Sequence, residues 1–110
     1  MQGKKESDFE KATAALAKNL HIHCRKCTGR SGTPDREFLA FGVWLKIELK
    51  RKGERPKPHQ IEEIDEITKH GGFATWADSI ELVEQLLRHL RHGELLHLQA
   101  LVRKNNYWTE

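Results

Sequence analysis

Apolar residues near the N-terminus recur at the three- and four-residue spacing of an amphipathic helix. Phe9 and Leu16 belong to this stripe, so we predict a helix over about residues 7–20. Ser7 or Asp8 would cap its first turn. The alanines within the segment are strong helix formers, which supports the same prediction.

The middle of the chain changes to the two-residue period of β-strands. The segment HIHCRKC at 21–27 predicts a short strand with Ile22 and Cys24 on one face, and the turn-rich segment TGRSGTPD at 28–35 interrupts regular structure. Residues 36–41 and 43–50 predict a hairpin with a glycine turn between them. In the second strand, valine, leucine and isoleucine alternate with tryptophan, lysine and glutamate, so one face is apolar and the other polar.

The C-terminal half returns to helical spacing. A helix is predicted to begin at Pro58, whose ring suits a first helical turn, and to end before Gly71. A short strand follows at about 72–78, and a serine-capped helix at about 79–91. A leucine-rich segment at 95–102 predicts one more helix.

The predicted order α-β-β-β-α-β-α, followed by an extra C-terminal helix, indicates an α/β fold with a small mixed sheet flanked by helices. The length of 110 residues fits a single domain, with a core over about 7–90 and a C-terminal helical extension over 91–110. The leucines of the extension exceed what one small sheet would obviously cover. They favour a contact between two copies of the chain, although a helix folded back onto the same core would explain them equally well.

Composition excludes some classes of protein and leaves others open. The chain has 19 basic and 16 acidic residues, a net charge of +3, which permits nucleic-acid binding without requiring it. No apolar stretch reaches the roughly 20 residues that span a bilayer, and the polar N-terminal segment does not resemble a secretory signal. We therefore expect a cytoplasmic protein with reduced cysteines and no membrane partner.

The polar face of the second hairpin strand carries the candidate chemistry. Glu48 and Lys50 are two residues apart, so a strand places both on one face, roughly 6.6–7 Å apart along the chain. Asp35 enters the preceding strand, and hairpin pairing can bring its carboxylate beside Glu48. Two carboxylates on one face suit a hard divalent cation such as Mg²⁺, and a nearby lysine can hold or deprotonate an attacking water.

A Glu-x-Lys pair alone is usually solvated surface. Here it belongs to an ordered set: a helix, Gly32-Thr33-Pro34-Asp35, a hairpin, Ile47-Glu48-Leu49-Lys50, and Gln60 at the start of a helix. This set resembles the core of the PD-(D/E)xK nucleases, and within them the VRR-NUC (virus-type replication–repair nuclease) branch. That branch includes small stand-alone phage and prophage proteins and the C-terminal domain of the Fanconi-associated nuclease. The resemblance to the stand-alone type implies that the cytoplasm is that of a bacterium or a phage-infected host cell. The resemblance covers roughly residues 7–90.

The resemblance implies a role for each matching residue. Asp35 and Glu48 would bind Mg²⁺ or Mn²⁺, and the main-chain carbonyl of Leu49 would complete the metal site. Lys50 would act on the attacking water, and Gln60 would support the site from the next helix. The implied activity is hydrolysis of DNA phosphodiester bonds by an endonuclease that acts on branched DNA such as a Holliday junction. No organic cofactor is implied.

The family also uses a glutamate from the first helix as a metal ligand. Glu6 and Glu10 are both candidates here, since they lie four residues apart on one helical face. Glu10 is slightly favoured because it lies well inside the predicted helix. Whichever of the two is not a ligand would be an ordinary solvent-facing charge.

Basic residues flank these motifs and would form a phosphate-binding track for DNA. They are Arg25, Lys26, Arg30, Arg36, Lys46, Arg51, Lys52, Arg55 and Lys57. Such clusters also arise in the loops of any chain with 32% charged residues. Stand-alone members of the family are expected to form homodimers, which would suit cleavage of two strands of a junction.

Two functions without catalysis are alternatives to the nuclease. One is a basic DNA-binding or assembly module that has kept the same fold, which would bind DNA in a salt-dependent way without a divalent metal. The other, weaker alternative is a structural or inhibitory partner protein that acts through the leucine-rich tail. The complete set of Asp35, Glu48 and Lys50 argues against the first alternative.

A zinc site is a separate consideration. Cys24 and Cys27 have the C-x₂-C spacing of half a zinc site. A second pair would have to come from His89 with His92 or His97, whose spacing along the predicted helices is unfavourable. We therefore interpret the cysteines as structural residues without a metal.

Overall fold

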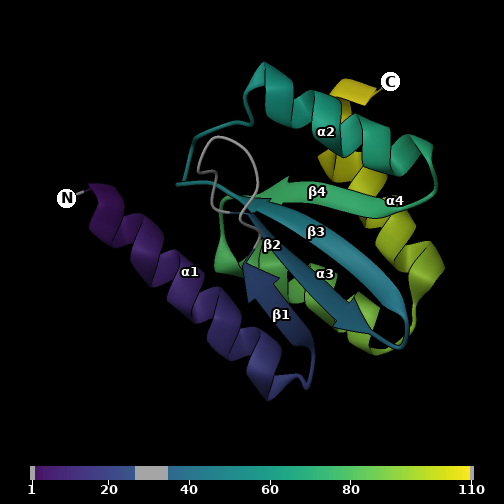
Figure 1. The fold of residues 1–110 in the computed structure, drawn as a ribbon, viewed down its shortest axis with the longest axis horizontal. Coiled ribbons are helices and arrows are strands. Elements are labelled where there is room, and N and C mark those ends of the chain that lie inside the picture. Colours follow the sequence, from purple (N-terminus) through teal and green to yellow (C-terminus); the bar gives the residue numbers. More distant parts are fainter. Residues whose placement is uncertain (1, 27–34, 110) are drawn as a thin grey trace.

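The computed structural model describes residues 2–26 and 35–109, with side chains over 8–26 and 36–108. Its elements in chain order are α1 (Gln2–Asn19), β1 (His23–Lys26), β2 (Asp35–Ala40), β3 (Val43–Leu49), α2 (Pro58–Lys69), β4 (Phe73–Ala77), α3 (Ile80–Arg91), α4 (Leu95–Asn105) and the 3₁₀ turn η2 (Tyr107–Thr109). This order confirms the predicted α/β arrangement, including the extra C-terminal helix (Figure 1).

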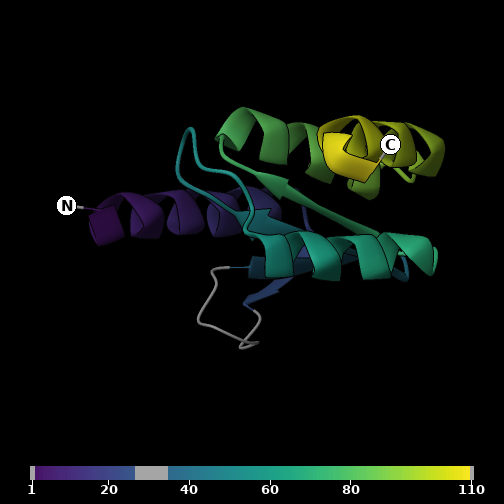
Figure 2. The same ribbon diagram turned by 90° about the horizontal axis from the view of Figure 1, so that it is seen from above.

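The four strands form one mixed sheet in the order β1-β2-β3-β4. The first three strands pair antiparallel, whereas β4 pairs parallel to β3 after the crossover through α2. Helices α3 and α4 lie on one face of the sheet and α2 on the other (Figure 2). We refer to these as the α3 face and the α2 face. Helix α1 packs beside β1 and against α3.

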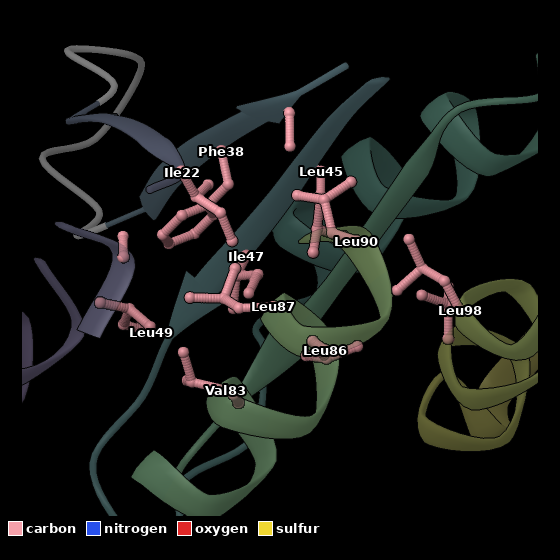
Figure 3. Packing of buried hydrophobic residues seen from close by; sticks show 14 residues of the cluster. Ile22, Phe38, Leu45, Ile47, Leu49, Val83, Leu86, Leu87, Leu90 and Leu98 are labelled. Carbon is pink, nitrogen blue, oxygen red and sulfur yellow. The ribbon is translucent and has the colours of Figure 1, made fainter. Parts of the chain in front are cut away.

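The main hydrophobic core fills the space between the sheet and α3 (Figure 3). Leu45, Ile47 and Leu49 of β3 contribute every second residue to it, as the two-residue period predicts. The α3 residues that pack against them are Val83, Leu86, Leu87 and Leu90. A smaller cluster under α2 contains Ile64, Ala74 and Trp76. The sheet is therefore packed on both faces, but unequally.

Local backbone chemistry explains where these elements turn and stop. Phe41 and Gly42 both have positive φ, 53° and 79°, which is the two-residue turn that matches the twist of a hairpin. Gly71, with φ 88°, follows the end of α2. The Ser79 hydroxyl accepts a hydrogen bond from the Leu82 N–H at 3.2 Å, which caps α3 as predicted.

The N-terminal helix is longer than predicted. It begins at Gln2 rather than near residue 7, so Ser7 and Asp8 lie inside α1 and not at its start. The preceding residues include lysine, glutamine and glutamate, which favour a helix enough to extend it past a potential cap. The predicted strand and helix boundaries elsewhere coincide with the observed ones or differ from them by at most three residues.

The C-terminal helix folds back onto the domain's own core. Leu98 and Val102 of α4 are buried in the main cluster, so the core extends beyond residue 90. Buried Asn106, just after α4, accepts a hydrogen bond from the Thr75 hydroxyl at 2.6 Å and donates one to the Ala74 carbonyl. None of the helices in the described part of the chain is both long and apolar enough to cross a membrane.

Candidate functional site

Strands β2 and β3 bring two predicted site positions together. In the antiparallel register Asp35 lies directly across from Glu48, as the hairpin predicts. Glu48 is on the α2 face, because Ile47 and Leu49 on either side of it are buried in the main core. Its side chain is nearly inaccessible, with 2% of its surface exposed. The Asp35 side chain lies outside the described residues.

Lys50 lies two residues after Glu48, immediately after the end of β3. Its N–H donates to the Ala77 carbonyl at 2.9 Å, so the pairing with β4 extends one residue beyond the end of β3. Lys50 is buried, 9% exposed. Leu49 therefore lies between a buried glutamate and a buried lysine. The C-terminal end of β3 is thus a place where charged residues are buried within the domain.

Gln60 approaches Glu48 from the first turn of α2. Its Oε1 accepts the Lys57 N–H at 2.8 Å, which satisfies a free donor at the start of the helix. Its Nε2 then donates to Glu48 Oε1 at 3.3 Å, and both side chains are buried. The cap thus orients the amide toward the carboxylate. The sequence predicted that Gln60 lies at this helix start. It did not predict that the hydrogen bond with Lys57 would orient the Gln60 amide toward Glu48.

Glu10 of the first helix lies in a different environment. Its carboxylate is 3.5 Å from Arg36 Nη2 and 3.7 Å from Lys26 Nζ. Arg36 is the register partner of core residue Ile47, so this ion cluster lies on the α3 side of the sheet. Glu6, one turn earlier in α1, has no described side chain.

The predicted phosphate-binding residues do not gather on one face. Arg25 pairs with Glu37 at 2.8 Å on the α2 face, whereas Lys26 and Arg36 meet Glu10 on the α3 side. Two other basic residues of the track form ion pairs: Arg51 with Glu54 and Lys46 with Glu63. Lys52 is exposed, and Arg30 lies outside the described residues. The bond from Arg51 holds the pKa of the Glu54 carboxyl below its usual value. Many of these cations are therefore already paired with acidic side chains.

One aromatic residue on the α2 face was not singled out from the sequence. Trp44 is 41% exposed, and the Arg25 guanidinium lies 4.7 Å from its ring centroid. The signal was present, because Trp44 falls in the polar phase of the β3 alternation. An exposed tryptophan beside arginine is a surface on which a nucleic-acid base can stack.

Of the two cysteines, Cys24 is the one that the described side chains include. Cys24 is half-buried against the main core, and its Sγ accepts a weak hydrogen bond from Arg36 at 3.9 Å. Cys27 lies outside the described residues. Cys24 thus acts as a packing residue.

This combination defines the class of the protein. A mixed sheet whose hairpin carries a buried Glu-x-Lys strand, with a glutamine-bearing helix above it, is the fold of the PD-(D/E)xK nucleases. No family model matches the chain, and no curated protein matches it. A solved structure described as a VRR_NUC domain is similar, with a TM-score of 0.67 and 31% identity over 77% of this chain and 96% of that chain. The chain belongs to the VRR-NUC family and is a nuclease-type DNA-processing domain.

Proposed function

We propose that the protein is a divalent-metal-dependent DNA endonuclease whose site is built on the end of β3. The observation that carries the proposal is the register of Asp35 across from buried Glu48, with Gln60 donating to Glu48. Mg²⁺ or Mn²⁺ is the proposed cofactor.

The residues present suit a hard cation. Like charges directly opposite each other in a sheet destabilise it, and burying a carboxylate is costly unless the charge is balanced. Gln60 donates to Glu48 Oε1 and orients the carboxylate. A hard cation between Asp35 and Glu48 would offset the repulsion between two carboxylates opposite each other, and Mg²⁺ binds through one or two carboxylates while keeping several waters. The carbonyl of Leu49 would be a further ligand.

The reaction would be hydrolysis of a DNA phosphodiester bond. A divalent cation supplies Lewis-acid polarisation of the scissile phosphate and lowers the pKa of an attacking water. Lys50, buried two residues from Glu48, would hold or accept a proton of that water, or stabilise negative charge on phosphorus. Gln60 would keep the Glu48 carboxylate in one orientation.

The first helix would contribute one more ligand. Both Glu6 and Glu10 remain candidates, but Glu10 is already paired with Arg36 and Lys26. That pairing favours Glu6, one helical turn earlier. Comparing Glu6→Gln with Glu10→Gln in the cleavage assay below distinguishes the two.

Branched DNA such as a Holliday junction is the proposed substrate, and a homodimer the proposed state. Two sites are needed to cut two strands of one junction. Exposed Leu95 and Leu96 of α4 offer some apolar surface for pairing, although Leu98 and Val102 are used within the domain. Arg25 and Trp44 on the open part of the α2 face would contact the DNA.

A cleavage assay tests the proposal. Labelled four-way junction and matched linear duplex are incubated with Mg²⁺, Mn²⁺ or EDTA. We expect metal-dependent cutting of the junction that Asp35→Ala and Glu48→Gln abolish. Glu63→Gln is the matched control, since Glu63 is a half-exposed carboxylate on the same side of the sheet, paired with Lys46.

Other outcomes would redirect the proposal. Cutting of both substrates alike would keep the nuclease and reject junction selectivity. Salt-sensitive DNA binding without product in either metal would instead support the non-catalytic DNA-binding or assembly module. Sedimentation of the same sample measures whether the active species is a dimer.

A further inference from the structure

The turn between α3 and α4 brings three metal-binding side chains together. His89 lies in the last turn of α3, Glu94 immediately before α4, and His97 in the first turn of α4. Gly93, with φ 69°, allows the chain to reverse, and the Glu94 N–H donates to the His89 carbonyl at 2.9 Å. The backbone of this turn is therefore held by its own hydrogen bonds.

The side chains converge on one small region. His89 Nδ1 is 2.9 Å from Glu94 Oε1, and the ring centroids of His89 and His97 are 5.6 Å apart. One donor atom from each of the three residues lies within 4.8 Å of the other two. The spacing of these histidines along the predicted helices is unfavourable for completing a zinc site with Cys24 and Cys27. The α3–α4 turn nevertheless brings the rings of His89 and His97 together, with Glu94 in place of the cysteines.

We propose that His89, Glu94 and His97 form a binding site for a d-block divalent cation such as Zn²⁺. Two imidazoles and one carboxylate are a ligand set that suits Zn²⁺ and excludes a preference for Mg²⁺. Ligand atoms in a tetrahedral zinc site lie roughly 3.3 Å apart, given bonds of about 2.0–2.1 Å. The His89–Glu94 pair is already near that separation, and exposed His97 can close the remaining distance by side-chain rotation.

The charge state of the cluster also suits a cation. The hydrogen bond with His89 holds the pKa of the Glu94 carboxyl below its usual value, and His92 and His97 lower it further. His89 Nδ1 and Glu94 Oε1 already lie 2.9 Å apart, so a cation bound by both residues would take the place of their direct contact.

This site is separate from the candidate nuclease site. The end of α3 lies beside the β2–β3 turn, where the Arg91 guanidinium is 5.1 Å from the Phe41 ring. Glu48 lies at the opposite end of β3 from that turn. Binding would tie α3 to α4 and stabilise the C-terminal part of the domain in proportion to the metal concentration.

A competition titration of the untagged full-length chain tests the site. Zn²⁺ is titrated against a chromophoric chelator in excess Mg²⁺, which keeps carboxylate-only sites occupied, and in a Cys24→Ser/Cys27→Ser background, which removes the thiols. We expect one saturable Zn²⁺ site whose affinity falls at least about tenfold in His89→Ala and in His97→Ala. At the same concentration, added Zn²⁺ should raise the melting temperature of the parent protein by more than that of these variants.

His70→Ala is the matched control. His70 Nδ1 lies 3.5 Å from Glu66 Oε2 on exposed α2, a similar pair without a second histidine among the described residues. Its substitution should leave zinc affinity unchanged. Equal affinity in the parent and His97→Ala, or no saturable binding to the parent, would overturn the proposal. Melting without zinc shows that each variant is folded.

Discussion

The two faces of β3 differ in what they bury. On the α3 face, Leu45 and Ile47 are completely buried against the hydrocarbon of α3. On the α2 face, neighbouring Glu48 is buried just as deeply, against the amide of Gln60. Burial of the first kind stabilises the fold by about 25 cal/mol per Å² of apolar surface, whereas burial of a carboxylate opposes folding unless it is compensated.

Under the proposed function, this difference separates residues that stabilise the fold from residues that act in the reaction. A local departure from good packing is expected at functional sites, where stability is sacrificed for a reactive arrangement. On the α2 face, buried Glu48 meets buried Gln60 of α2, and buried Lys50 follows two residues after Glu48. Substitutions on the two faces should therefore affect different measurements: unfolding on the α3 face and cleavage on the α2 face.

The largest effect is expected at Lys50. Lys50→Ala should reduce DNA cleavage on the order of a thousandfold, equivalent to about 4 kcal/mol in the barrier, because a positioned cation at the reacting phosphate is lost. Single-turnover cleavage rates with saturating enzyme measure this. DNA affinity and the melting temperature should change little.

Lys46→Ala is the control for Lys50, since Lys46 lies on the same strand and face but pairs with Glu63 at 2.6 Å. If Lys50→Ala cut at the parental rate, Lys50 would have no part in the reaction. If Lys46→Ala lost as much activity as Lys50→Ala, the effect would reflect the general charge of the face rather than a positioned group.

The sequence alone predicted these two faces because a strand has a simple period. Alternation along 43–50 is enough to assign Ile47 to the core and Glu48 to the opposite face. The hairpin glycine, the Ser79 cap and the order of elements are also local signals. The predicted start of α1 was wrong because two local signals compete there. A capping residue favours a start near residue 7, but the summed helix propensity of the preceding residues extends the helix to Gln2.

Contacts between distant segments could not be predicted in the same way. The pairing of Glu10 with Arg36 depends on the angle at which α1 crosses the sheet, and no local pattern encodes that angle. The convergence of His89 and His97 depends on the α3–α4 turn. The leucines of α4 look the same in sequence whether they meet the chain's own core or a second copy.

The next effect in size is expected on the α3 face. Leu87 is completely buried in the main cluster, so Leu87→Ala should lower the free energy of unfolding by about 3 kcal/mol through lost transfer energy and a cavity. Urea unfolding followed by circular dichroism measures it. Leu96→Ala is the matched control, because Leu96 is 82% exposed. A similar loss in both variants would mean that Leu96 is covered in solution, as a dimer contact would require.

The smallest effect on cleavage is expected for Gln60→Ala, which tests whether the hydrogen bond from Gln60 to Glu48 matters for the reaction. Gln60→Ala removes the donor to Glu48 and the acceptor for the Lys57 N–H, which water can replace at the helix start. Because Gln60 orients a ligand without being the reacting group, cleavage should fall by about 10- to 100-fold, and higher Mg²⁺ should restore part of it. Lys50→Ala should show no such recovery, since its defect is not in metal binding. If Gln60→Ala lost stability as Leu87→Ala does while cutting at the parental rate per folded molecule, Gln60 would belong to the packing of the α2 face. The distinction between stabilising and reacting residues would then apply to the two faces of β3 and would not extend to helix α2.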